Sequence, residues 1–439
     1  MSQTVVPSTN GASALSQPNI VAANWFASMS PVERKTFWCC FYAWTLDAMA
    51  VQTYVVVMPT LILLWGLSKS QAGMLGTSAL LVSSLGGWLA GILADRFGRV
   101  RVLRWTVMWF TAFTFLSGLT HGYLPLLVMR SMQGLGFGGE WAAGGVLISE
   151  VISKESRGRA AGTVASGWAV GYGSAVLLYS IVFSFAPAAQ AWRILFFLGL
   201  IPALIVLWVC RDLAEPQVYL NQREGLKKRE SHLLEIFQPQ LVRTTVVSSL
   251  LAMGALGGNY TILTWLPTYL KLVRHLTVLN TGAYLGLNIL GSFTGYVVSA
   301  HLSDKLGRKK TFALTGICTA ITLAVYTLLP LNGTAVLLLG FPLGLFQSGI
   351  IAGMSATFSE LFPTRVRGTG QGFSYNTGRG VGSFVPLLVG YAGGYTSLGT
   401  AIGICALCSY GVFLIATSLL PETRGKELSE RLTGAYASD

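Results

Sequence analysis

Residues 91–101 read GILADRFGRVR, and residues 300–310 read AHLSDKLGRKK. Each stretch ends a long apolar run, and the shared pattern Asp-(Arg/Lys)-x-Gly-Arg returns after 209 residues. Two further pairs return at nearly the same spacing: Ser149-Glu150 with Ser359-Glu360, and Pro59-Thr60 with Pro267-Thr268. A chain that repeats such markers at one offset is predicted to consist of two related halves.

The composition is that of a membrane protein. Of the 439 residues, 52% are hydrophobic and only 11% are charged, whereas soluble domains carry about 25% charged residues. A spanning helix needs about 20 mainly apolar residues. Such runs are predicted near 36–65, 72–94, 103–119, 124–152, 160–186, 193–211, 244–270, 280–303, 312–330, 334–361, 369–392 and 398–420.

Polar segments divide these runs into two groups of six. Residues 212–243 form the only long polar interior segment, between a half at 36–211 and a half at 244–420. Residues 1–35 and 421–439 are predicted to be cytoplasmic tails. Residues 1–30 lack the basic segment and apolar core of a cleavable signal peptide, so the first run is expected to remain as an anchor.

The distribution of Lys and Arg predicts the orientation. If both termini lie on one side, that side receives 24 of the 30 Lys and Arg residues. The opposite side receives four, and the remaining two fall inside spans: Lys69, Arg193, Lys271 and Arg274, then Arg130 and Arg379. Because positive loops stay in the cytoplasm, both termini and the central loop are predicted to be cytoplasmic.

The net charge of +13 does not indicate a nucleic-acid partner, because the charges sit in short segments between apolar runs. The six cysteines lie in or beside apolar runs, and Cys405-Ala-Leu-Cys408 has no second pair that would complete a zinc site. No nucleotide loop or catalytic triad pattern is present either. We therefore expect that the protein binds neither a metal nor a cofactor and that it is not an enzyme.

Three motifs resemble the major facilitator superfamily. They are the loop Gly91-x-x-x-Asp95-Arg96-x-Gly98-Arg99-x-Arg101, the fourth-run motif Arg130-x-x-Gln133-Gly134-x-Gly136, and Pro421-Glu422-Thr423 after the twelfth run. The resemblance covers about residues 30–430. It implies an all-α membrane protein with twelve transmembrane helices in two six-helix halves, acting as a monomer in the lipid bilayer.

A closer similarity is to bacterial metabolite/proton symporters, the group of aromatic-acid, lactate and sialate carriers. It rests on Leu46-Asp47, Gly138-Gly139-Glu140-Trp141 and Tyr375-Asn376-x-Gly378-Arg379. This resemblance implies uptake of a small organic anion, a monocarboxylate or an aromatic acid, together with protons. Transport would proceed by alternating access across the bacterial inner membrane.

Charges inside the spans indicate where function resides. Only Asp47, Arg130, Glu140 and Arg379 lie well inside the predicted spans. Such a residue costs about 2.5–3.5 kcal/mol at the bilayer centre, so it normally faces a cavity or a partner. Arg379 is the first choice for the substrate carboxylate, because a guanidinium grips two oxygens and keeps its charge. The alternative is a structural salt bridge, although the C-terminal half offers no deep acid.

Other polar and aromatic residues are predicted near the same depth. Asn376 lies one turn before Arg379 and on the same face. Asn259, Asn288 and Gln347 are either ligands or interhelical hydrogen-bond partners. The predicted substrate site is completed by Gln52 and by aromatic residues that could stack on an aromatic acid, Tyr54, Trp168 and Tyr172. Trp141, Tyr260 and Trp265 are further aromatic residues of these helices.

Asp47, Glu140 and Arg130 form the predicted proton-coupling set, in which the two acids are the candidates for carrying the proton. A carboxyl group that moves between an apolar cavity and an arginine can load and release a proton. Either could instead be a structural hydrogen-bond acceptor. Arg130 lies ten residues before Glu140, almost three helical turns away, and is expected to meet Asp47 or water.

One position departs from the pattern of the related carriers. They usually have a second acid three residues after Asp47, where this chain has Ala50. Coupling could therefore run through Glu140 alone or be absent, and the alanine could be natural or introduced. An uncoupled facilitator is one alternative function.

The repeated loops suggest gating. The resemblance assigns Asp95, Arg96, Arg99 and their counterparts a latch role, and the full predicted set is Asp95, Arg96, Arg99, Glu150, Asp304, Arg308 and Glu360. The alternative is that the cations only signal topology.

An exporter and a substrate sensor are two further alternatives to an importer. A proton-driven exporter of organic acids or drugs would often carry Gly-Pro in the fifth run, which here has no proline before Pro187. A substrate sensor would be expected to carry a large extra cytoplasmic domain.

Overall fold

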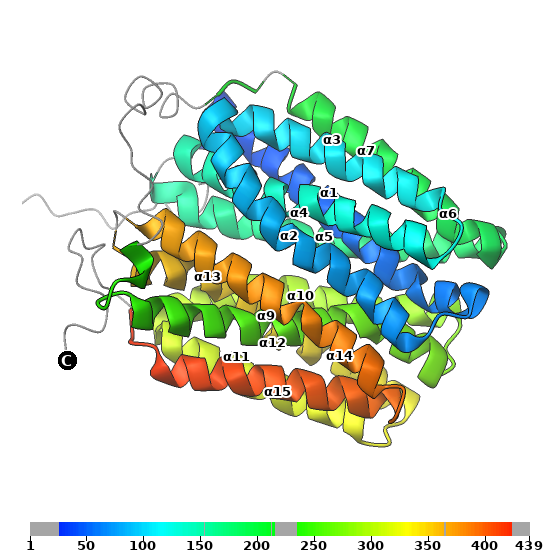
Figure 1. The fold of residues 1–439 in the computed structure, drawn as a ribbon. Coiled ribbons are helices and arrows are strands. Elements are labelled where there is room, and N and C mark those ends of the chain that lie inside the picture. The colour runs from blue at the N-terminus through cyan, green and yellow to red at the C-terminus, as the bar shows by residue number, and fades with distance from the viewer. Residues whose placement is uncertain (1–25, 153, 212, 216–234, 364–365, 424–439) are drawn as a thin grey trace, which may run out of the picture.

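The computed structural model describes residues 26–152, 154–211, 213–215, 235–363 and 366–423. Within these ranges the chain is almost entirely helical and contains no strand. The helices form two bundles that lie side by side, with both described ends of the chain at the same end of the molecule (Figure 1). We call this the terminal end.

The N-terminal half comprises α1 (Pro31–Trp65), α2 (Lys69–Phe97), α3 (Arg99–Gly118), α4 (Tyr123–Val151), α5 (Lys154–Phe185), α6 (Ala188–Leu198) and α7 (Leu200–Val209). The C-terminal half begins with the short 3₁₀ helix η2 (Glu235–Phe237). It continues with α9 (Val242–Thr268), the π-helix η3 (Tyr269–Val273), α10 (Val278–Leu306), α11 (Arg308–Leu328), α12 (Gly333–Leu361), α13 (Arg367–Gly382), α14 (Phe384–Ala392) and α15 (Leu398–Leu419).

The twelve predicted spans correspond to these helices, with three differences in detail. The sixth span is divided at Gly199 into α6 and α7, and the eleventh is divided at Ser383 into α13 and α14. The first helix starts at Pro31 rather than at residue 36. Ser30 caps it, accepting from the Glu33 N–H at 3.2 Å while the Glu33 carboxylate accepts from the Ser30 N–H at 2.8 Å. Hydropathy misses this polar first turn.

Within the described ranges, eight helices are long and apolar enough to cross a membrane by length and composition alone: Pro31–Trp65, Lys69–Ala94, Thr163–Phe185, Ala188–Val209, Val242–Val273, Arg308–Leu328, Gly333–Leu361 and Leu398–Leu419. The spans that fall short are α3, α4, α10 and the pair α13 and α14. They carry arginines, internal charges, or many glycine and polar residues. The least apolar spans therefore include the two that hold Glu140 and Arg379.

The repeat extends to the close packing of helices. Glycines bring α2 against α4 and α10 against α12, where an added Cβ would collide with a carbonyl of the facing helix. Gly86 meets the carbonyl of Leu135, and Gly295 meets that of Leu345 in the other half. Gly134 with Ala79 and Gly344 with Asn288 form a second such pair. Small residues at these crossings let the helix backbones approach in lipid.

A carboxylate caps the same helix in each half. Glu215 accepts from the N–H groups of Val100 and Arg101 at 3.2 and 3.0 Å. Glu422 accepts from those of Arg308 and Lys309 at 2.9 and 3.3 Å. The preceding Gly98 and Gly307 have φ of 107° and 98°, a conformation that glycine tolerates. A negative group at a helix N-terminus is stabilising, so α3 and α11 are anchored alike.

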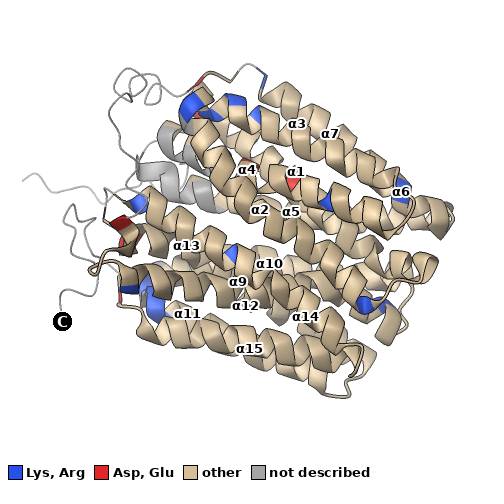
Figure 2. Cartoon of the chain, viewed as in Figure 1, with Lys and Arg blue, Asp and Glu red and all other residues tan. Residues whose placement is uncertain are grey.

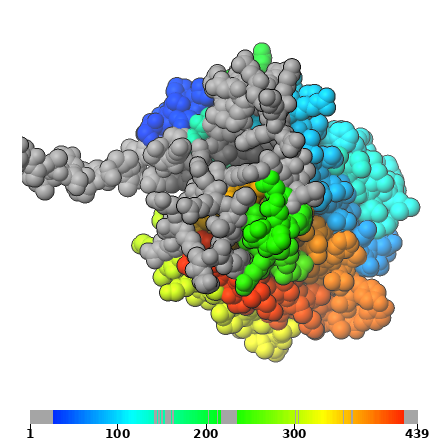
Figure 3. All heavy atoms as spheres, turned by 60° about the vertical axis from the view of Figure 1, so that its left-hand side comes forward, coloured from blue at the N-terminus to red at the C-terminus, as the bar shows by residue number. Residues whose placement is uncertain are grey.

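The halves are joined mainly by α2 against α13 and α14, and by α5 against α10. At the end opposite the termini, Lys69 Nζ donates to the Gly393 carbonyl at 2.6 Å, and Thr77 Oγ1 donates to the Ser383 carbonyl at 2.7 Å. Thr77 thus uses a carbonyl at the break between α13 and α14. Figure 3 views the terminal end, where η2 and the start of α9, in green, lie beside the orange and red helices.

Cys39 on α1 and Cys210, just after α7, form a disulfide with Cα atoms 5.5 Å apart. The sequence reasoning did not predict this pairing, because it treated the cysteines only as residues of apolar runs.

Candidate functional site

Arg379 lies in the middle of the bundle on α13, with only 2% of its surface exposed. Its guanidinium carbon lies 4.9 Å from the Phe137 ring centroid on α4 and 5.0 Å from that of Tyr375. The hydroxyl groups of Tyr260 and Tyr375 also lie within electrostatic reach of its charge. A buried cation is therefore held by aromatic residues from both halves, as cation–π geometry favours.

The two buried acids face each other across α1 and α4. The carboxyl groups of Asp47 and Glu140 lie next to each other, and both lie within the electrostatic reach of Arg379. Each residue is 1% exposed. Among the described residues, no donor reaches either Asp47 oxygen or Glu140 Oε2. Two neighbouring carboxyl groups buried in this way cannot both be ionised at low cost.

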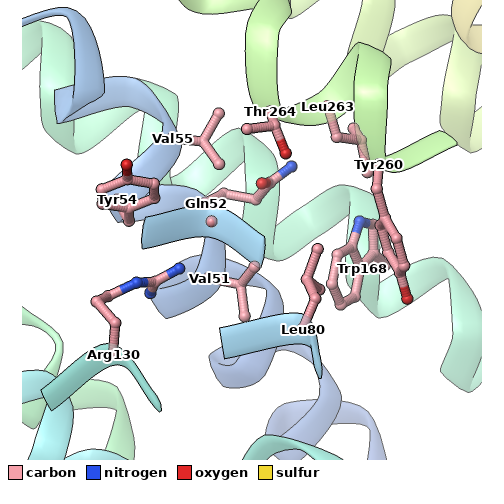
Figure 4. A pocket seen from close by; sticks show the side chains of 11 residues that line it. Val51, Gln52, Tyr54, Val55, Leu80, Arg130, Trp168, Tyr260, Leu263 and Thr264 are labelled. Carbon is pink, nitrogen blue, oxygen red and sulfur yellow. The ribbon is translucent and has the colours of Figure 1, made fainter. Parts of the chain in front are cut away.

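A cavity lies between the halves (Figure 4). It is lined by Val51, Gln52, Tyr54 and Val55 of α1, Gly76 and Leu80 of α2, Arg130 of α4, Trp168 of α5, and Tyr260, Leu263 and Thr264 of α9. Its volume, measured for the centres of water molecules, is about 20 Å³. That is room for about one water, so an organic acid would need the halves to move apart. Tyr260 connects this cavity to Arg379.

Arg130 does not contact Asp47, one of its two expected partners. Its Nη1 donates to Gln133 Oε1, and its guanidinium carbon lies 4.5 Å from the Tyr54 ring centroid. Gln133 in turn donates to Thr114 Oγ1 at 2.7 Å. The Nε–H of Arg130 has no acceptor among the described residues. Three helical turns of α4 separate Arg130 from Glu140, and its side chain faces the cavity instead.

The predicted substrate residues fall into distinct groups. Gln52, Tyr54 and Trp168 line the cavity, and their role as substrate contacts stays a prediction. Gln347 Nε2 donates to Asn259 Oδ1, and Asn288 Nδ2 donates to the Gly340 carbonyl at 3.1 Å. These contacts correspond to the interhelical alternative.

Asn376 and Tyr172 occupy other positions. Asn376 Nδ2 donates to the Gly372 carbonyl at 3.0 Å, and its Oδ1 faces Gly87 of the opposite half with no donor in the described part of the chain. Tyr172 is buried but does not line the cavity.

Among the predicted gating residues whose side chains are described, the following contacts lie within one half. Arg308 forms a two-point ion pair with Glu360, at 2.8 Å for Nη2–Oε1 and 3.2 Å for Nε–Oε2. Thr423 Oγ1 also donates to Glu360, at 2.6 Å. Arg99 Nη1 donates to the Ala94 carbonyl at 2.8 Å, and Arg96 packs over Phe97. The side chains of Asp95, Glu150 and Asp304 lie outside the described residues.

Sequence reasoning left Phe137 and Thr264 out of the site. Neither has a signal of its own, because an apolar or hydroxyl side chain in a membrane helix is ordinary. Tyr375 stood in a recognised motif but was given no role. Only the approach of α4 and α9 to α13 reveals these contacts. Figure 2 shows how few described charges lie inside the bundle compared with its terminal end.

The family model of the Major Facilitator Superfamily matches residues 40–386 and again 288–436. The chain is 41% identical over 401 residues to a probable 4-methylmuconolactone transporter of Cupriavidus pinatubonensis, covering 91% of this chain and 93% of that protein. It is 30% identical over 357 residues to the cis,cis-muconate transport protein of Acinetobacter baylyi, covering 78% and 85%. The inward-open xylose transporter XylE of E. coli superposes with a TM-score of 0.73 at 20% identity, covering 89% and 97%.

The chain belongs to the Major Facilitator Superfamily. It is an integral membrane protein of twelve helices in two halves, and a transporter rather than an enzyme. The sequence-based identification of fold and family is thereby confirmed.

Proposed function

We propose that this protein imports a small unsaturated or aromatic carboxylate together with protons. One observation carries the proposal: a fixed cation of the C-terminal half, Arg379, lies within electrostatic reach of two neighbouring buried acids of the N-terminal half, Asp47 and Glu140. An anion site and a proton site in direct electrostatic contact are what coupling requires. Relatives named for muconolactone and muconate transport support the substrate class.

The substrate carboxylate binds Arg379. Without a substrate, the Arg379 charge is shared by Tyr260, Tyr375 and the two acids. A guanidinium in a dry site forms strong two-point hydrogen bonds with a carboxylate, and these replace the tyrosine contacts. Phe137 and Trp168, with ring centroids 6.0 Å apart, supply an apolar wall for an unsaturated ring or chain.

Arg130 binds a second acceptor of the substrate, rather than relaying protons. It is fully buried, lines the cavity and keeps an Nε–H without an acceptor among the described residues. 4-Methylmuconolactone offers a lactone carbonyl beside its carboxylate, and cis,cis-muconate offers a second carboxylate. Either group would satisfy this donor, because a buried donor without a partner costs about 1–3 kcal/mol.

Protons travel on the Asp47–Glu140 pair. Neighbouring buried carboxyls cannot both be ionised at low cost, so the pair holds a proton while Arg379 is occupied by a substrate anion. When the anion leaves, Arg379 becomes available to stabilise negative charge on the pair, and the proton can follow. Glu140 would supply the second acid that is absent at Ala50.

Alternating access moves this site between the two sides of the bacterial inner membrane. The excess of Lys and Arg at the terminal end supports a cytoplasmic location for both termini. The contacts of Lys69 and Thr77 across the halves then lie on the outer side, in keeping with a state closed to the outside. The latch role of the Arg308 and Glu360 region remains a prediction, as does action as a monomer.

Uptake by the purified protein in liposomes tests the proposal. We expect labelled 4-methylmuconolactone or cis,cis-muconate to accumulate, and accumulation to increase under an inward proton gradient. Equal uptake with and without the gradient would identify an uncoupled facilitator, which the alanine at position 50 makes the second candidate function. No uptake of any carboxylate would reject the organic-anion assignment.

A further inference from the structure

Carboxylates are missing from the end of the bundle opposite the termini, which the proposed topology makes the outer end. The loops there are residues 66–68, 119–122, 186–187, 274–277, 329–332 and 393–397, and all of them lie within the described part of the chain. None of the 17 Asp and Glu residues falls in these loops or in the helical turns that border them. The outer end therefore carries positive charge with no acidic counter-ion.

The four Lys and Arg residues at this end differ in what they contact. Arg193 donates to the Gly118 carbonyl at 2.7 Å, and Arg274 donates to the Leu331 carbonyl at 2.7 Å, each within its own half. Lys69 and Lys271 instead reach across to the opposite half. Only contacts of this second kind must break when the halves separate at the outer end.

Lys271 sits in the π-helical turn η3 that ends α9, and it is half-buried. Its Nζ donates to Thr60 Oγ1 of α1 at 2.9 Å and to the Tyr179 hydroxyl of α5 at 3.3 Å. The Phe183 ring centroid lies 5.5 Å from Nζ. Thr60 and Tyr179 are each at most 2% exposed. The ammonium is thus held by neutral hydroxyls and rings, and no carboxylate balances it.

Opening of the outer end removes this arrangement. Thr60, Tyr179 and Phe183 belong to the N-terminal half, whereas Lys271 moves with the C-terminal half. The ammonium would then face the opening beside aromatic residues and without a counter-ion. A partly desolvated cation is stabilised most by an anion that hydrogen-bonds it.

We infer that Lys271 is an outer docking site for the substrate carboxylate, occupied before the anion reaches Arg379. The inference rests on the proposed function, because it assumes import of an organic anion. In the outward-open state the Lys271 ammonium binds the carboxylate in place of Thr60 and Tyr179. Closure returns these hydroxyls to Nζ, which releases the anion toward the cavity.

The test compares initial uptake of labelled 4-methylmuconolactone by right-side-out vesicles containing the parent, Lys271→Gln, Lys271→Arg or Arg193→Gln. Arg193 is the matched control, since it is a cation at the same end that does not cross between the halves. In the water-filled opening, the Lys271 ammonium would lie about 4 Å from the substrate carboxylate. Loss of this attraction in Lys271→Gln should raise KM about fivefold. Lys271→Arg and Arg193→Gln should keep the KM of the parent, and maximal rates should change little.

Ionic strength provides a second measurement that needs no variant. The KM of the parent should rise between about 20 mM and about 300 mM external salt, because screening shortens the reach of the charge. The neutral methyl ester of the same lactone should inhibit uptake of the labelled acid equally well in the parent and in Lys271→Gln.

Three results would overturn the docking role. The first is an unchanged KM in Lys271→Gln, and the second is a KM of the parent that does not respond to salt. The third is competition by the ester that weakens in Lys271→Gln as much as the uptake of the acid does. Failure of the parent to take up the acid at all would instead reject the proposed function.

Discussion

The carboxyl groups of Asp47 on α1 and Glu140 on α4 lie next to each other, and both lie within the electrostatic reach of Arg379 on α13. The pair belongs to one half of the molecule and the arginine to the other. Any movement of the halves that alters this separation changes the cost of ionising the pair. Proton binding and anion binding are thereby linked through one charge.

Glu140→Gln is predicted to abolish coupling while preserving binding. The amide can still donate to Asp47 and fills nearly the same space, but it carries no exchangeable charge. An inward gradient of one pH unit is worth about tenfold accumulation per proton, and this gain should disappear. Exchange of labelled for unlabelled substrate without a gradient should continue. Gradient-driven uptake equal to that of the parent would show that Glu140 is not a coupling residue.

Ala50→Asp is predicted to bring no gain in coupling. Ala50 is 1% exposed, and burying a carboxyl there without a partner should lower stability by about 1–3 kcal/mol. Thermal unfolding and gradient-stimulated uptake should be measured on the same preparation. A parent that ignores the gradient and a variant that responds to it would mean that Glu140 does not replace the missing acid.

Arg130→Gln is predicted to discriminate between substrates by their number of acceptors. If Arg130 binds a second acceptor, the KM for cis,cis-muconate should rise by about tenfold or more, because a hydrogen bond to a charged group is worth about 1.5–3 kcal/mol. The KM for benzoate, which has one carboxylate and no other acceptor, should change far less. Equal effects on both acids would assign Arg130 to packing against Tyr54 and Gln133.

Gly138→Ala is predicted to destabilise the N-terminal half. An added Cβ would collide with the Ser83 carbonyl on α2, so α2 and α4 would have to separate at a cost of about 1–3 kcal/mol. Gly286→Ala on α10 is the control, because its Cβ would meet nothing within 4 Å. Thermal unfolding in detergent should show a lower midpoint only for Gly138→Ala. Matching midpoints for the two variants would argue against close packing at this crossing.

The fold was predictable because its signals are local or periodic. The long apolar runs follow directly from the thickness of the bilayer, and the paired loops at Asp95 and Asp304 mark the internal repeat. The orientation that the distribution of Lys and Arg indicates stays a prediction. The glycine crossings of α2 with α4 and α10 with α12 repeat at the same offset. The break at Ser383 was missed although a local signal for it exists, because Pro386 has no N–H to donate to the Gly382 carbonyl. The contact of this break with Thr77 of the other half was not predictable.

The site was predictable in residue type but not in pairing. The cost of burying charge singles out Asp47, Arg130, Glu140 and Arg379 within the sequence. It does not indicate that Glu140 meets Asp47, or that Arg130 turns toward Tyr54 and the cavity. These choices depend on how α1 and α4 are rotated against each other. Likewise, Asn259 and Gln347 satisfy each other, which only the approach of α9 to α12 determines.

The most direct test of proton coupling through Arg379 is the internal pH of liposomes containing the protein, recorded when 4-methylmuconolactone is added outside. Arg379→Gln and Arg379→Lys should be measured beside the parent. Our account predicts prompt acidification with the parent, none with Arg379→Gln, and a reduced response with Arg379→Lys, whose ammonium lacks the two-point grip of a guanidinium. Acidification that persists in Arg379→Gln, or uptake by the parent without any change in internal pH, would contradict it.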